Sequence, residues 1–238
     1  TVWSGARPAP RPGWLLVRGD RIASCGTAHA PEPAAEAIID LEAGHLLPGF
    51  CDAHSHLSVG AWLPAVEDGR VLRSADEALA AVRALAAAKA PGDWIVFGRV
   101  DLDHWTGGRV PTAADLDEAS AGRPVLLIDL TLHRGVLSNE GLRRCEIGRD
   151  THDALGDIVR GRRGEPTGLV WERAFGRALY TALRALAADA GETGVDGLLD
   201  REAQSHLRLG ITRVHEPGVP PDVHARLAAL AARTPLRL

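Results

Sequence analysis

The sequence predicts an α/β fold in which a small all-β segment precedes a longer region built on a parallel sheet. Two observations support this prediction. From about residue 47 onward, short apolar runs alternate with helical patterns, and this alternation is typical of a parallel sheet covered by helices. The chain has 238 residues, of which 45% are hydrophobic and 24% are charged. It is therefore long enough for a sizeable core and has the composition of a globular protein.

The front of the chain carries strand and turn signals. Residues 14–18 and 21–23 are short apolar runs, and the Gly19-Asp20 pair between them fits the tight turn of a β-hairpin. Another short strand is expected over residues 37–41, closed by Gly44. Residues 1–46 are therefore expected to form a small all-β piece.

The elements expected after residue 46 follow from apolar periodicity and breaker residues. A helix should begin at the capping box formed by Ser74 and Glu77 and end at Pro91-Gly92. The other expected elements are strands at 46–54, 94–97, 124–130, 211–214 and 235–238, and helices at 173–189, at 196–209 and from Pro221 onward. Residues 101–123 and 140–170 are expected to be long connections that wall a substrate pocket.

Composition excludes several classes of protein. The net charge of −4 comes without a basic stripe, so nucleic acid is not an expected partner. No apolar run reaches the roughly 18 residues that span a bilayer. The three cysteines are far apart, which disfavours a disulfide framework and favours a reducing, cytoplasmic location. Formation of a homo-oligomer stays open.

The sharpest chemical feature is the run Asp52-Ala-His54-Ser-His56 at the end of the strand expected over 46–54. Side chains alternate along a strand, so His54, His56 and Asp52 are expected on one face. Two imidazoles placed in this way can bind one divalent metal. Such a metal would lower the pKa of its bound water toward 7 and supply hydroxide at neutral pH. The alternative is a pair of ordinary pocket or surface histidines.

This run belongs to a longer resemblance. Residues 47–57, Leu-Pro-Gly-Phe-Cys-Asp-Ala-His-Ser-His-Leu, resemble the opening signature of the amidohydrolase superfamily. Segments 127–133, 138–142, 164–172 and 210–216 resemble its YtcJ-like branch, amidohydrolase family 3. The resemblance covers nearly the whole chain. It implies a metal-dependent hydrolase of carbon–nitrogen bonds other than peptide bonds, of the amide or N-substituted formamide type, that acts on a small molecule through metal-activated water.

The resemblance also implies a fold and a set of site residues. The fold would be a (β/α)8 TIM barrel with a small β-sandwich, residues 1–46 belonging to the sandwich and residues 47–238 to the first half of the barrel. The metal, with zinc as first choice, would be held by His54, His56 and Glu172. The alternative for Glu172 is an acid that stabilises a helix N-terminus. His133, Asn139 and His215 are the candidate substrate-binding residues, with capping or structural roles as their alternatives.

The family uses more ligands than this sequence offers. Its later-strand histidines have no counterpart here, and the aspartate that serves as general base is expected beyond residue 238. The absence of methionine, even at position 1, favours an N-terminal fragment. A non-catalytic fragment or pseudoenzyme, or a deaminase or isomerase on the same scaffold, are therefore the alternatives. An open half-barrel exposes strand edges and apolar faces, so the 238-residue chain alone is expected to aggregate.

Overall fold

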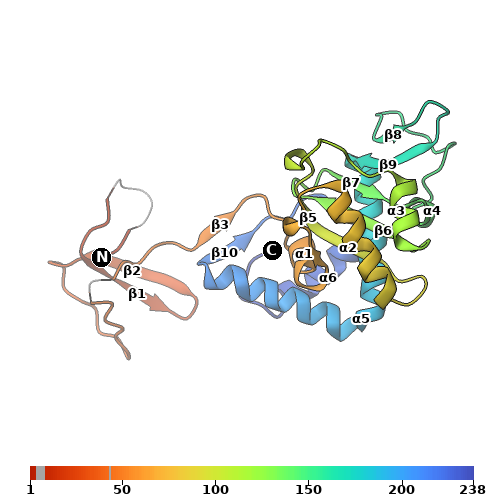
Figure 1. Cartoon of the computed structure of the whole chain (residues 1–238). Coiled ribbons are helices and arrows are strands. Elements are labelled where there is room, and N and C mark those ends of the chain that lie inside the picture. The colour runs from red at the N-terminus through yellow and green to blue at the C-terminus, as the bar shows by residue number, and fades with distance from the viewer. Residues whose placement is uncertain (4–8, 43) are drawn as a thin grey trace. The chain divides into compact units, whose positions relative to one another are not determined.

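The computed structural model describes residues 1–3, 9–42 and 44–238, which form two compact units (Figure 1). The small unit comprises Thr1–Ser55, Ser205–Pro217 and Pro235–Leu238, and the large unit comprises His56–Gln204 and Gly218–Thr234. In the described part of the chain, no helix combines the length and apolar character that are needed to traverse a bilayer.

Within its described residues, the small unit holds two separate two-stranded sheets. The antiparallel hairpin of β1 (Gly13–Arg18) and β2 (Arg21–Thr27) confirms the hairpin predicted from the sequence. Its turn uses Gly19 with a φ of 60°, a conformation that glycine adopts without steric cost. The second sheet is a parallel pair of β3 (Phe50–Asp52) and β10 (Ile211–Val214).

The strand predicted over residues 37–41 is wrong. The structure assigns no strand to this stretch, and the side chains of Ile38 and Ile39 are largely exposed. The Asp40 carboxylate accepts a hydrogen bond from the backbone N–H of Glu42 at 2.7 Å, and Glu42 has a φ of 49°. The chain therefore makes a local turn at this point, which takes the place of a sheet ladder.

The large unit is built on a mixed sheet whose strand order, within the described residues, is β4-β5-β6-β7-β9-β8. Its strands are β4 (Glu67–Asp68), β5 (Ile95–Val100), β6 (Val125–Asp129), β7 (Arg134–Leu137), β8 (Ile158–Arg160) and β9 (Pro166–Trp171). The first three are parallel, but β6–β7, β7–β9 and β9–β8 are antiparallel. The predicted parallel pairing is therefore correct for β4, β5 and β6, as it is for β3 and β10 in the small unit. Strands β7, β8 and β9 were not predicted as strands from the sequence, and they pair antiparallel.

The helices are α1 (Leu57–Gly60), α2 (Ala75–Ala88), α3 (Ala113–Ser120), α4 (Asn139–Arg144), α5 (Glu172–Arg208) and α6 (Pro221–Ala231). Ser74 caps α2 by accepting a hydrogen bond from the N–H of Glu77, as predicted. The break predicted at Gly191 is a kink inside α5, where φ is 71° and ψ is 169°. The two long connections predicted from the sequence are wrong, because they contain α3, most of α4, β8 and part of β9.

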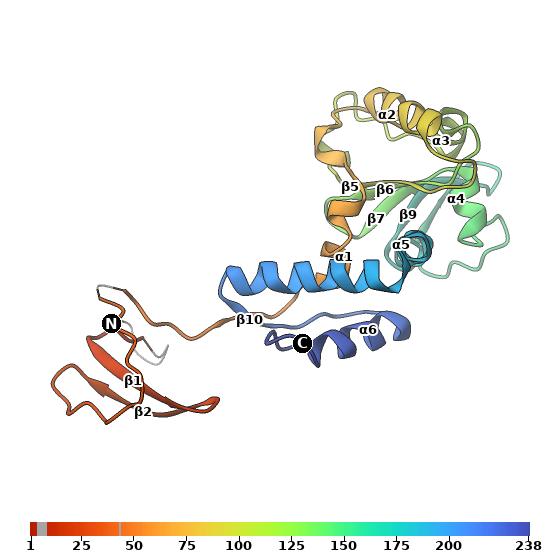
Figure 2. The same cartoon turned by 90° about the horizontal axis from the view of Figure 1, so that it is seen from below.

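The core of the large unit holds the sheet rigid. Val82 of α2, Ile95 of β5, Leu116 of α3 and Leu127 of β6 are fully buried in one apolar cluster. Figure 2 shows α2 and α3 side by side over one face of this sheet and the first half of α5 on the opposite side. Each such side chain contributes about 1.5–3 kcal/mol through burial. The ends of the strands are thereby fixed in place.

The strands of the described residues close no barrel, since they form separate sheets. What the structure shows is a mixed α/β fold.

Candidate active site

In the small unit, the connections that follow two parallel strands are joined by hydrogen bonds. The N–H of His215, just after β10, donates to the carbonyl oxygen of Asp52 at 2.8 Å, and the N–H of Ser55 donates to the carbonyl oxygen of His215 at 3.0 Å. The pairing of β3 with β10 therefore brings His54 and His215 to the carboxyl ends of neighbouring strands, the edge where open α/β sheets bind ligands.

The histidine pair lies beyond the strand, contrary to the expectation that it continues β3. β3 ends at Asp52, whose carboxylate accepts a hydrogen bond from the N–H of His54 at 3.1 Å. This bond turns the chain out of the extended conformation. His56 is the residue that precedes α1. The alternation of side chains along a strand therefore does not determine where the two imidazoles point.

In the large unit, the structure brings together two residues that the sequence singles out separately. Nδ1 of His133 lies 3.2 Å from Oε2 of Glu172, and both side chains are well exposed. The N–H of Glu172 also donates to the carbonyl oxygen of His133 at 2.8 Å. His133 precedes β7 and Glu172 follows β9, so the antiparallel pairing of these strands aligns them. The pair forms a polar contact at the edge of the sheet, accessible to solvent.

A buried carboxylate organises the same edge. Asp129, at the end of β6, is 1% exposed and accepts hydrogen bonds from the N–H of Leu102, from the N–H and hydroxyl of Thr131, and from Nη2 of Arg134. Burial by itself would raise the pKa of Asp129, but the hydrogen bonds from Thr131 and Arg134 outweigh it and lower this pKa. Asp129 is therefore ionised at neutral pH, and its hydrogen bonds connect the end of β6 to the segment after β5 and to the start of β7.

Further ion pairs lie at the carboxyl ends of the parallel strands. Asp68, at the end of β4, pairs with Arg70 at 2.8 Å and with Arg99 of β5 at 3.5 Å. Hydrogen bonds from Arg70 lower the pKa of Asp68 to about 2. After β5, the His104 ring donates a hydrogen bond to the Asp101 carboxylate, and this bond raises the pKa of His104. The exposed edge of the sheet is thus lined by charged groups that already have partners.

Several residues at this edge of the large unit's sheet have a strained backbone conformation. Arg99, Leu132 and Glu172 have φ angles of 62°, 57° and 37°, a region that residues other than glycine rarely occupy. They lie in β5, after β6 and after β9. Such conformations cost free energy and cluster at functional sites.

Asn139 lies elsewhere. It follows the end of β7, where Leu137 pairs with Leu126 near the start of β6, so His133 and Asn139 lie at opposite ends of the strand. Asn139 borders a cleft of about 450 Å³ that is also lined by the first turn of α3 and the start of β9. The structure therefore gives Asn139 and His133 separate surroundings.

The fit to a metal ion is incomplete. Among residues 1–3, 9–42 and 44–238, no group of three or more histidine, cysteine, aspartate or glutamate side chains could hold a metal ion. Catalytic zinc normally has three protein ligands. The described residues therefore do not form a complete metal centre.

Asp129, Arg134 and Trp171 were not predicted from the sequence as residues of the site. One signal was available, because Asp129 lies within the apolar run of β6, and a charged residue inside a buried strand needs a partner. The identity of that partner is not readable from local sequence.

The fold is thus mixed α/β, and polar residues lie at the carboxyl ends of its parallel strands, the edge at which open α/β sheets bind ligands. The amidohydrolase family model matches residues 37–238. The chain belongs to the amidohydrolase family, in the family 3 branch to which the sequence analysis assigned it.

Similar proteins support this membership. The N-substituted formamide deformylase of Arthrobacter pascens is 32% identical over 207 residues, which are 84% of this chain and 38% of that protein. The Bacillus subtilis (strain 168) protein YtcJ is 31% identical over 137 residues, 57% of this chain and 26% of that protein. The chain therefore spans well under half the length of these two relatives.

The fold is similar to that of solved structures. The crystal structure of an uncharacterized metal-dependent hydrolase from Pyrococcus furiosus has a TM-score of 0.53 and is 23% identical in sequence. The match covers 94% of this chain and 44% of that one. At this identity the likeness concerns the fold alone.

Proposed function

We propose that this protein is a metal-dependent hydrolase of small molecules that cleaves carbon–nitrogen bonds other than peptide bonds, of the amide or N-substituted formamide type. Membership of the amidohydrolase family across residues 37–238 carries the proposal. The histidine pair that follows β3 supports it. Backbone hydrogen bonds from His215 to Asp52 and from Ser55 to His215 join the segments that follow the parallel strands β3 and β10, and His54 lies in the first of these segments.

In this proposal, His54 and His56 hold a divalent metal, with zinc as first choice. Glu172 is a proposed further ligand that rests on the sequence resemblance alone, because the described residues include no group of three side chains that could hold a metal ion. When bound, such a metal supplies a hydroxide at neutral pH and polarises the carbonyl group of the substrate. His133 and His215 are proposed to contact the substrate. Asn139 is the weakest member of the substrate-binding set, because it lies at the other end of β7 from His133.

We also propose that the parallel strands belong to a (β/α)8 TIM barrel, with residues 47–238 in the barrel and residues 1–46 in a small β-sandwich. The family membership and the fold likeness support this assignment. The parallel order of β4, β5 and β6 is the arrangement that such a barrel uses.

A second candidate function is that of a non-catalytic relative of these hydrolases. One observation favours it, since the described residues assemble no set of three metal ligands. Two histidines alone bind a metal more weakly than the usual three protein ligands.

Metal content and hydrolysis together test the proposal. Purified protein is loaded with zinc and dialysed, its metal is measured by mass spectrometry, and amine release from a simple N-alkylformamide is followed. We expect about one zinc per chain to remain after dialysis, and amine release that is abolished when a chelator removes the zinc. Zinc binding should be lost in the His54→Ala and His56→Ala variants and kept in His152→Ala and His224→Ala.

The outcomes separate the two candidates. Equal zinc content in all four variants would show that His54 and His56 do not bind the metal. Metal-free protein that binds no zinc and releases no amine would favour the non-catalytic function.

A further inference from the structure

We propose that Arg134 is a positioning residue that holds His133 and Glu172 together at the edge of the large unit's sheet. The relevance of this role to catalysis rests on the proposed function, in which both residues belong to the reaction site. The role itself is argued from the contacts of Arg134, from the register of β7 with β9, and from the free-energy cost of the arrangement.

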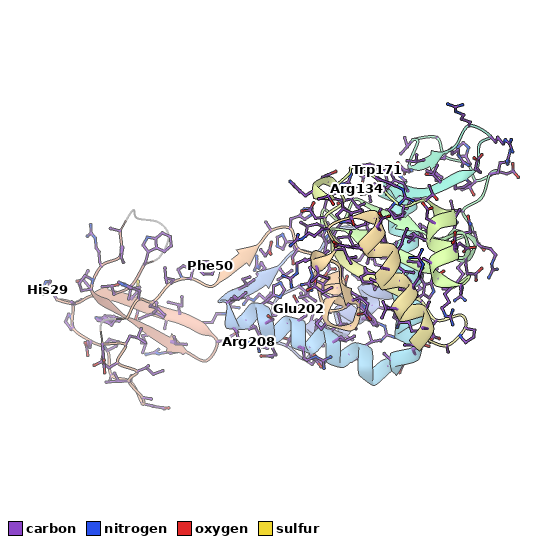
Figure 3. All side chains as sticks on the ribbon, viewed as in Figure 1. His29, Phe50, Arg134, Trp171, Glu202 and Arg208 are labelled. Atoms are coloured by element: carbon purple, nitrogen blue, oxygen red, sulfur yellow. The ribbon has the colours of Figure 1, made fainter. Side chains whose placement is uncertain are left out.

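Arg134 is held on two sides. Its Nη2 lies 2.7 Å from Oδ1 of Asp103 and 3.2 Å from Oδ2 of the buried Asp129. Its guanidinium carbon lies 5.1 Å from the centre of the Trp171 ring, within the range of a cation–π interaction. Figure 3 shows Arg134 and Trp171 next to each other. The side chain of Arg134 is 13% exposed, so these contacts leave it little freedom.

Because of the register of β7 with β9, the fixed position of Arg134 also restrains the neighbouring pair, His133 and Glu172. Arg134 is the direct cross-strand partner of Trp171 in the antiparallel ladder of β7 and β9. His133 and Glu172 are the next residues along the two strands, and their backbones are joined by the 2.8 Å hydrogen bond described above. A guanidinium fixed over Trp171 therefore fixes the spacing at which the His133 imidazole meets the Glu172 carboxylate.

Stability alone does not explain this arrangement. Nε of Arg134 is buried without a hydrogen-bond partner, which costs free energy. Leu132 and Glu172, on either side of the ladder, have φ angles of 57° and 37°. Apolar residues of similar volume often replace a buried ion pair without loss of stability. A site that combines these costs is better explained by positioning than by folding.

Arg160 is a matched control. It is a half-buried arginine of β8 in the same unit, and its guanidinium donates hydrogen bonds to four backbone carbonyls, those of Gly148, Arg149, Thr151 and Gly164. It pairs with Pro166 at the other end of β9 from Trp171. The Arg160→Met variant therefore removes a structural guanidinium away from the His133–Glu172 pair.

The experiment compares Arg134→Met, Arg134→Lys and Arg160→Met with the unmodified full chain, loaded with zinc. We expect kcat for an N-alkylformamide to fall roughly 10²-fold in Arg134→Met, with KM changed by less than about threefold, because misplacement of reacting groups by about 1 Å has effects of this size. Arg134→Lys should recover part of kcat, since it keeps the charge but not the planar fork. Arg160→Met should keep kcat while losing thermal stability.

Amide hydrogen exchange gives a readout that does not depend on activity. The N–H of Glu172 should exchange about tenfold faster or more in Arg134→Met, and at the rate of the unmodified protein in Arg160→Met. Unchanged exchange in Arg134→Met, or equal loss of kcat in the two methionine variants, would overturn the positioning role. If the unmodified protein binds zinc but releases no amine, the proposed function fails, and the exchange comparison still decides the role of Arg134.

Discussion

Replacement of Ser138 by alanine should destabilise the large unit far more than the loss of an ordinary helix cap. The Ser138 hydroxyl is completely buried and makes three hydrogen bonds. It accepts from the N–H of Val125 at 3.0 Å and from the N–H of Gly141 at 3.1 Å, and it donates to the carbonyl oxygen of Arg123 at 3.0 Å. One oxygen thus caps α4 and closes the start of β6.

The expected loss of unfolding free energy follows from the groups that lose a hydrogen-bond partner in Ser138→Ala. The N–H of Val125, whose residue is fully buried, would remain unsatisfied at a cost of about 1–3 kcal/mol. Loss of the cap on α4 adds about 1 kcal/mol. The expected total is about 2–4 kcal/mol, which corresponds to a shift of the urea midpoint by roughly 1–2 M.

Equilibrium urea unfolding, followed by tryptophan fluorescence, measures the change. Ser74→Ala is the matched control, because Ser74 caps α2 through the N–H of Glu77 at the protein surface, and its loss should cost about 1 kcal/mol. The unfolding slopes of the variants must agree for the comparison to hold. If Ser138→Ala costs no more than Ser74→Ala, the assignment of the extra free energy to the buried N–H of Val125 is refuted.

Three further predictions concern the same unit. Gly168→Ala should destabilise more than Gly164→Ala in thermal melts, because both glycines have positive φ but a Cβ at Gly168 would meet backbone atoms at 2.7 and 2.8 Å, whereas a Cβ at Gly164 meets nothing within 4 Å; equal losses would contradict the steric argument. Hydrogen bonds and charges from neighbouring arginines lower the pKa of Glu140 to about 2 from 4.5, so its contribution to stability is present above pH 4.5 and lost as pH falls toward 2; Glu140→Gln should show a smaller drop in melting temperature between pH 5 and pH 3, and an unchanged drop would count against it. Burial raises the pKa of the Cys145 thiol to about 11, so a thiol reagent at pH 8 should label the two exposed cysteines rapidly and Cys145 only after denaturation; rapid labelling of all three would disprove this.

Local signals in the sequence predict much of the fold correctly. The hairpin turn at Gly19, the cap at Ser74 and the kink at Gly191 each depend on the conformational preferences of a few adjacent residues. The buried strand at 124–130 was predictable because its apolar run leaves no polar face. The family resemblance that begins at residues 47–57 also came from the sequence alone.

Tertiary structure decided the remainder. Strands β7 and β8 are short and carry arginine, and β9 begins with proline and contains a glycine. They form because they pair with one another and with β6, a pairing that local propensity does not encode. The contact between His133 and Glu172 joins residues 39 positions apart. Asp129 is ionised in the interior only because Thr131 and Arg134 surround it. The sequence determined which residues have side chains that can bind a metal or a substrate. The nonlocal pairing of strands determined which of these residues are in contact, because contacts between distant segments form only when the chain closes into a packed sheet.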